Sequence, residues 1–174
     1  MLSFSFPVRS AKASARQRYT GLTRTGALVL VVMSLSACAP AVDVDPAPNA
    51  NDPSCADTMV ILPDEVSGHE RRDTNSQATA VWGDPAAIVL RCGVASPSRV
   101  TTDPCVTANG VDWIAREGET AWTLTTFGRT PATEVLFDPL EVPSSNVLPE
   151  LAAAVQANPA ETECLSTEQE TNLP

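Results

Sequence analysis

The stretch CVTANGVDWIAREGETAWTLTTFGRTPATEVLFDP, residues 105–139, decides the fold class of this 174-residue chain. Asn109-Gly110 between valine-rich flanks predicts a β-hairpin, because a two-residue type I′ turn needs positive φ at both central positions. Residues 117–119 and 128–131 are glycine-containing and predict two further turns. Between these turns, residues 122–127 alternate with period two, Trp and Leu on one side and Thr and Phe on the other. The stretch therefore predicts an antiparallel meander with one buried face.

The flanking segments add strands upstream and a helix downstream. Residues 77–83 and 86–94 predict two strands joined by a tight turn, and residues 56–62 a short strand that ends at Pro63. The polar residues 63–76 predict a short helical turn with a loop. In SNVLPELAAAVQANP, 145–159, the apolar residues fall on one helical face. We therefore expect an α+β fold, a small antiparallel sheet covered by a C-terminal helix.

Four of the five cysteines lie in this part of the chain, and an even number in an exported protein indicates disulfides. A zinc site is not expected, because there is no CxxC pair and His69 is the single histidine. Four cysteines allow three pairings. We expect Cys92–Cys105, which closes a local loop, and Cys55–Cys164, which ties the two ends of the domain. The domain is thus predicted to be stapled by two disulfides.

The remaining cysteine, Cys38, follows a segment with the layout of an export signal. Residues 1–37 contain a basic region without acidic residues, an apolar run, and then small residues. The apolar run is too short for a spanning helix, which needs about 20 residues. The sequence Leu35-Ser36-Ala37-Cys38 resembles the lipobox of bacterial lipoproteins. This resemblance implies that Cys38 carries a palmitate-type diacylglyceryl group and anchors the protein to the extracytoplasmic face of the cell membrane; ordinary secretion is the alternative.

Composition divides the rest of the chain and excludes some partners. Residues 38–54 are acidic and proline-rich, which predicts a disordered tether. We expect a single domain over residues 55–165 and a disordered tail over residues 166–174. From Cys38 onward there are six arginines, no lysine and all 21 acidic residues, which gives a formal charge of −15. Nucleic acid is therefore excluded as an expected partner, because binding it needs a basic face.

The sequence contains few candidates for catalysis. The single histidine, His69, lies in a polar stretch that reads as an exposed loop, and there is no GxSxG motif, phosphate loop or dinucleotide fingerprint. We therefore expect neither a cofactor nor a metal, and we expect that the protein is not an enzyme. An envelope hydrolase that uses acidic residues is the alternative.

Candidates for binding are tryptophans and arginines. Trp82, Trp113 and Trp122 form either a ligand platform or part of the core, the core being the more common role. Arg71-Arg72 could clamp a phosphate or carboxylate, or form internal salt bridges. Arg91 alternates with inward-facing residues and is expected on the open side of the sheet. We name Arg91, Arg71, Arg72 and Trp113 as candidate ligand-binding residues.

Three motifs resemble those of an actinobacterial envelope family, the domain of unknown function thirty-five-fifteen. They are TAVWGDPAAIVLRCGV (79–94), GVDW (110–113) and TTFGRTPATEV (125–135). The resemblance implies an exported lipoprotein or membrane protein, and it supplies no catalytic residue, cofactor or substrate. We expect a non-catalytic binding or scaffolding module with an envelope protein or a cell-wall partner.

Overall fold

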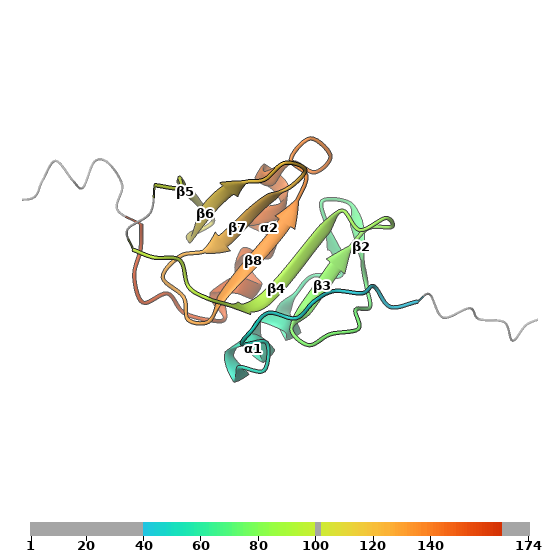
Figure 1. Ribbon diagram of the computed structural model, residues 1–174, viewed down its shortest axis with the longest axis horizontal. Helices are drawn as coiled ribbons and strands as arrows, with labels where there is room; N and C mark the ends of the chain where they lie inside the picture. The colour runs from blue at the N-terminus through green and yellow to red at the C-terminus, as the bar shows by residue number, and fades with distance from the viewer. Residues whose placement is uncertain (1–39, 100–101, 165–174) are drawn as a thin grey trace, which may run out of the picture. The chain divides into compact units, whose positions relative to one another are not determined.

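In the computed structural model, which describes residues 40–99 and 102–164, eight strands form one antiparallel sheet with the order β1-β2-β3-β4-β8-β7-β6-β5 (Figure 1). The leader 1–37, Cys38 and the tail 166–174 lie outside the described residues. The strands are β1 Glu65–Val66, β2 His69–Arg72, β3 Thr79–Trp82, β4 Ile88–Val94, β5 Cys105–Ala108, β6 Val111–Glu117, β7 Trp122–Thr126 and β8 Ala132–Phe137, and the helices are α1 Pro53–Ile61 and α2 Ser144–Gln156.

The predicted meander is present as β5-β6-β7-β8. Asn109 and Gly110 have φ values of 47° and 75°, as the type I′ turn between β5 and β6 requires. The second turn is closed by a hydrogen bond of 3.0 Å from the Gly118 N–H to the Ala121 carbonyl. Gly128 has a φ of 71° in the third turn. The last strand, β8, then pairs with β4, which joins the meander to β1–β4.

Helix α2 covers one face of the sheet, and Figure 1 shows it behind the strands of the meander. Its apolar stripe is buried together with alternate residues of β3, β4, β6, β7 and β8. Each fully buried leucine or valine contributes about 1.5–3 kcal/mol to stability relative to an exposed position. The predicted α+β architecture is therefore confirmed. We call the opposite face, which α2 does not cover, the open face. Within the described residues, no helix is long and apolar enough to cross a membrane.

The predicted strand at residues 56–62 is wrong, because this segment belongs to α1. Asp52 caps the helix, its Oδ1 accepting the Ser54 N–H at 2.9 Å, and Pro53 occupies the first helical position. Both features favour helix initiation. The apolar run that suggested a strand leaves Val60 and Ile61 exposed at the end of the helix. Cap chemistry therefore outweighs the β propensity of Val and Ile here.

The polar segment 63–76, predicted as a helical turn and loop, instead forms the β1–β2 hairpin. Its turn is Ser67-Gly68, with φ values of 51° and 80°. The hairpin is attached to α2 by a hydrogen bond of 2.7 Å from the Ser67 N–H to Glu150 Oε2. His69, expected in an exposed loop, is a half-buried residue of β2.

The segment Pro40–Asp52 packs along the domain and is not the disordered tether that its composition predicts. Val42 donates its N–H to the Asp73 carbonyl at 2.8 Å, and Asn49 donates to the Gly93 carbonyl at 2.9 Å. Figure 1 shows this blue segment passing across β3 before it reaches α1. Backbone hydrogen bonds hold the segment, and composition does not reveal them. The folded unit therefore begins before residue 55.

All four cysteines of the domain are in disulfides, as predicted, but the pairing is Cys55–Cys92 and Cys105–Cys164. The expected Cys92–Cys105 bridge is wrong because β4 and β5 are four strand steps apart in the sheet. Four steps of about 4.8 Å give about 19 Å, whereas bridged cysteines have Cα atoms within about 7 Å. Each disulfide therefore ties one end of the domain to the sheet, not the two ends to each other.

Candidate functional site

A row of four side chains, three of them polar, crosses the centre of the open face. Arg91 on β4, Glu134 on β8, Thr125 on β7 and Ile114 on β6 are cross-strand neighbours. Arg91 thus points to the open side, as its alternation predicted. Its guanidinium forms an ion pair with Glu134, with the Nε–Oε1 hydrogen bond at 2.6 Å.

The Arg91 guanidinium also contacts the segment that runs in from residue 40. Its Nη1 lies 3.4 Å from the Asp45 carbonyl oxygen. The Glu134 side chain is only 12% exposed. Because a partly buried carboxylate is stabilised by a charged donor, Arg91 fixes the position of Glu134 and links it to the docked N-terminal segment.

A cleft of about 260 Å³ lies beside this row, between the strands and the loop that follows β4. Glu134, Thr125 and Ile114 form its strand side. Arg116 on β6 also lines it, with a side chain that is 72% exposed and that contacts Asp103 Oδ2 at 2.7 Å. The other side consists of Val94 at the end of β4 and of Ala95, Pro97 and Ser98 in the loop that follows. We call this the open-face cleft; it combines apolar walls with two hydroxyls and one charge of each sign.

A second hollow of about 210 Å³ adjoins it and shares Pro97. One of its sides is the chain after α2, with Glu161 and Thr162. The remaining lining residues are Ser96, Arg99, Phe127, Gly128 and Thr130. The loop 94–99 therefore separates two neighbouring depressions, and the C-terminal segment shapes only the second.

The C-terminal segment is held in place by two charged residues, Asp112 on β6 and Arg129 in the turn after β7. Arg129 is 5% exposed, and its Nη1 donates a hydrogen bond to the Asn158 carbonyl. Burial lowers the pKa of the Arg129 guanidinium, and the nearby Asp112 carboxylate opposes that shift. Asp112 Oδ2 accepts the Cys164 N–H at 2.7 Å. These residues have a structural role, since they fasten the segment that carries Cys164 to the sheet.

Of the two roles left open for the tryptophans, the core is the one observed, and the candidate ligand-binding role of Trp113 is wrong. Trp82 and Trp113 are fully buried in the core under α2, so Trp113 cannot present its ring to a ligand. Trp122 is half-buried and packs against the same core. The more common role of tryptophan, in the core, is the one observed.

Of the two roles left open for Arg71-Arg72, Arg72 shows the internal salt bridge and the pair does not form a clamp. Arg71 and Arg72 occupy successive positions of β2, and successive side chains of a strand point to opposite faces. Arg72 forms an ion pair of 2.9 Å with Asp84 and lies 3.5 Å from the Pro40 carbonyl oxygen. The two guanidinium groups therefore do not converge on a common ligand.

Sequence reasoning missed Arg116 and Glu134, which line the open-face cleft. The signal for Arg116 was present in the hairpin, because counting by twos from the Asn109-Gly110 turn places Arg116 on the face opposite Trp113. Glu134 could not be found in this way, since its neighbour Arg91 belongs to a strand that is distant in sequence.

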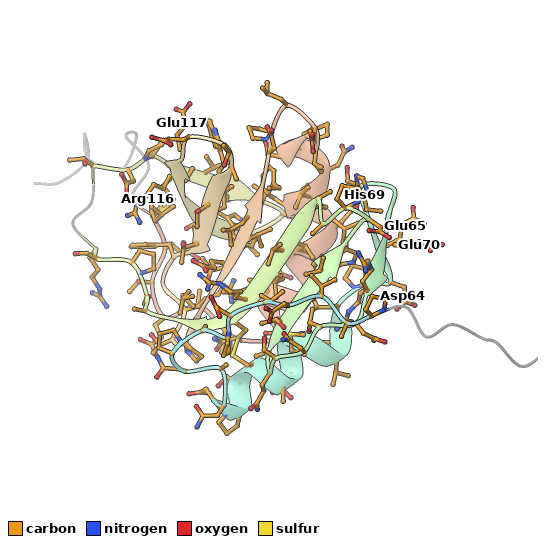
Figure 2. The ribbon with its side chains drawn as sticks, turned by 45° about the vertical axis from the view of Figure 1, so that its right-hand side comes forward. Asp64, Glu65, His69, Glu70, Arg116 and Glu117 are labelled. Atoms are coloured by element: carbon orange, nitrogen blue, oxygen red, sulfur yellow. A yellow bond between two sulfur atoms is a disulfide. The ribbon has the colours of Figure 1, made fainter. Side chains whose placement is uncertain are left out.

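One group of potential metal ligands occurs among the described residues, Cys105, Asp112 and Cys164. Both cysteines are joined in a disulfide, so neither offers the thiolate that a metal ion needs. Figure 2 labels two further groups of polar residues: Arg116 and Glu117 lie at one side of the molecule, and Asp64, Glu65, His69 and Glu70 at the other.

A family model described as "Protein of unknown function (DUF3515)" matches residues 22–164 of the chain. No curated protein and no solved structure matches it. The match covers the segment that leads into Cys38, the docked segment, the whole sheet and both disulfides.

Proposed function

The chain belongs to the DUF3515 family of proteins of unknown function, and we propose that it is a lipid-anchored envelope protein whose open-face cleft binds a polar cell-wall ligand without catalysis. The anchor is a diacylglyceryl group on Cys38, and the domain lies on the extracytoplasmic side of the cell membrane. The observation that carries the proposal is the cleft, which joins Arg116 and Thr125 to an apolar wall.

Two disulfides support the extracytoplasmic location. Such bonds form and persist in oxidising compartments and are rare in the cytosol. The leader and the lipobox-like residues before Cys38 supply the route and the attachment point. A single acyl chain gives only marginal binding to a membrane, whereas two chains give stable anchoring.

The chemistry of the open-face cleft supports binding of a small polar ligand. Ligand sites combine apolar walls with a few positioned polar groups. Here Ile114 and Pro97 provide apolar surface, and the hydroxyl of Thr125 suits a hydrogen bond to a sugar or amide group. The exposed Arg116 guanidinium suits a carboxylate, such as that of a wall peptide.

Hydrolysis receives less support from the same residues. Glycosidases use two carboxyl groups that flank the scissile bond. Among the described residues that line the open-face cleft, Glu134 is the single carboxylate, and it is paired with Arg91. This is why we propose a binding protein in preference to the alternative, an envelope hydrolase.

The test is a titration of the exported domain with soluble disaccharide-peptide fragments of peptidoglycan, followed by calorimetry. R116Q removes the charged donor of the cleft, and R72Q is the matched control, because Arg72 is also ion-paired but does not line the cleft. A hydrogen bond to a charged group contributes about 1.5–3 kcal/mol, so R116Q should weaken binding by about 10- to 150-fold. The R72Q variant should bind as the unmodified protein does.

Three results would count against the proposal. If the fragments do not bind the unmodified domain, the cell-wall ligand is wrong. If R116Q and R72Q weaken binding equally, the ligand does not occupy the open-face cleft. Release of a cleaved product during the titration would revive the hydrolase alternative.

A further inference from the structure

We propose that the β1–β2 edge of the sheet is the surface that faces the lipid bilayer, and that the open-face cleft is held away from it. This inference rests on the proposed anchor at Cys38. The residues that follow the anchor are fixed to the domain from Pro40 onward and do not form a free tether.

The chain between the anchor and the domain is too short to let the domain float away from the membrane. Two peptide units join the Cα of Cys38 to that of Pro40, and two units span about 7 Å at most in any conformation. Pro40 itself lies against β2, because Arg72 Nη2 is 3.5 Å from its carbonyl oxygen. Val42 continues the contact by pairing with Thr74, just after β2. The part of the domain nearest the lipid is therefore the part around β2.

Strand order then places the cleft at a distance from that edge. Five strand steps separate β2 from β6, the strand that carries Arg116. At about 4.8 Å per step this is about 24 Å. Figure 2 shows the same separation, with Glu65 and Glu70 at one side of the molecule and Arg116 and Glu117 at the other.

Charge favours an upright domain over one that lies flat on the membrane. The chain from Cys38 onward carries a formal charge of −15, and anionic lipids repel acidic groups that come within a Debye length, about 8 Å at physiological salt. The β1–β2 edge already exposes Asp64, Glu65 and Glu70. Lying flat would bring more acidic groups into this range, so contact is restricted to the edge that the anchor holds.

The test places a fluorescent non-canonical amino acid at Glu70 or at Glu117, which avoids labelling chemistry on the cysteines. Both positions are exposed glutamates on strands, so each is a matched control for the other. The full-length lipidated protein is reconstituted in phosphatidylglycerol-phosphatidylcholine vesicles that carry a quencher on the lipid headgroups. We expect strong quenching at Glu70 and little at Glu117.

A second variant tests the role of the short connection. A 20-residue Gly/Ser insertion between Ala39 and Pro40 has an r.m.s. length of about 25 Å, and it should reduce quenching at Glu70 to the level seen at Glu117. Equal quenching at the two positions of the lipidated protein without the insertion, or stronger quenching at Glu117, would overturn the inference but leave the anchor intact. A chain that carries no lipid by mass and does not float with vesicles would overturn the anchor, and this inference with it.

Discussion

Removing the disulfide that closes the shorter loop, Cys55–Cys92, should destabilise the domain more than removing the one that closes the longer loop, Cys105–Cys164. Cys55–Cys92 encloses a sequence separation of 37 residues, and Cys105–Cys164 one of 59. Chain entropy alone predicts losses of about 3.8 and about 4.2 kcal/mol for C55A/C92A and C105A/C164A. Chain entropy alone would therefore make the loss of Cys105–Cys164 slightly more destabilising.

Burial reverses the order. Cys55 and Cys92 are 1% and 0% exposed and lie in a small cluster with Ala50 and Ala78, whereas Cys105 is exposed. Replacing two buried sulfurs by hydrogen leaves a cavity, which adds a cost of about 24 cal/mol per Å³. We therefore expect C55A/C92A to lose more stability than C105A/C164A, by about 1 kcal/mol or more. Domains of this size have about 5–15 kcal/mol in total, so the first variant should be close to unfolding.

The assay is guanidinium unfolding at equilibrium, together with thiol titration of the unfolded chains. In the domain without Cys38, both double variants should contain no free thiol, because the remaining two cysteines are partners. The cross variant C92A/C105A is the control, and it should expose two free thiols, those of Cys55 and Cys164. If C92A/C105A instead shows none, the pairing described here is incorrect. If C105A/C164A is the less stable variant, the reasoning from burial is refuted.

Two further substitutions test the docked segment and the core. G93A should lower the melting temperature more than G68A and make residues 40–52 sensitive to protease. Both glycines have positive φ, but a Cβ at Gly93 would meet the Asn49 carbonyl carbon at 2.5 Å, while one at Gly68 meets nothing within 4 Å. Equal effects of the two substitutions would argue against the docking of the segment. W82F should cost about 1 kcal/mol more than W113F in the free energy of unfolding, because Trp82 Nε1 donates to the Pro63 carbonyl at 3.1 Å and Trp113 Nε1 has no partner among the described residues. Urea unfolding measures this free energy for both variants. A larger loss for W113F would contradict the assigned contacts.

The fold class was readable because its signals are local. The Asn109-Gly110 turn and the period-two alternation that follows set the register of three strands. The change to a 3.6-residue period after residue 144 marked α2. The two elements that were predicted wrongly depend on different interactions. Helix α1 depends on the cap at Asp52, and the β1–β2 hairpin depends on the Ser67-Gly68 turn and on a hydrogen bond to α2.

The candidate site was only partly predictable, because it is built from pairings between distant residues. Alternation placed Arg91 on the open face, but its partner Glu134 lies 43 residues away and is reached only through the β4–β8 pairing. The disulfide pairing failed for the same reason, since closeness in sequence suggested Cys92–Cys105 while the sheet order separates them. Trp113 was misassigned as a candidate because residue type alone does not distinguish a platform from a core.

The most direct test of the central claim is the intact mass of the native protein taken from its own membranes, before and after reduction and alkylation. We predict a chain that begins at Cys38 with a diacylglyceryl group, and four thiols that appear only after reduction, with peptides linked as Cys55–Cys92 and Cys105–Cys164. A chain without lipid would contradict the anchored envelope protein. A thiol that is free before reduction would contradict the doubly stapled domain and would bring cysteine chemistry back as a function.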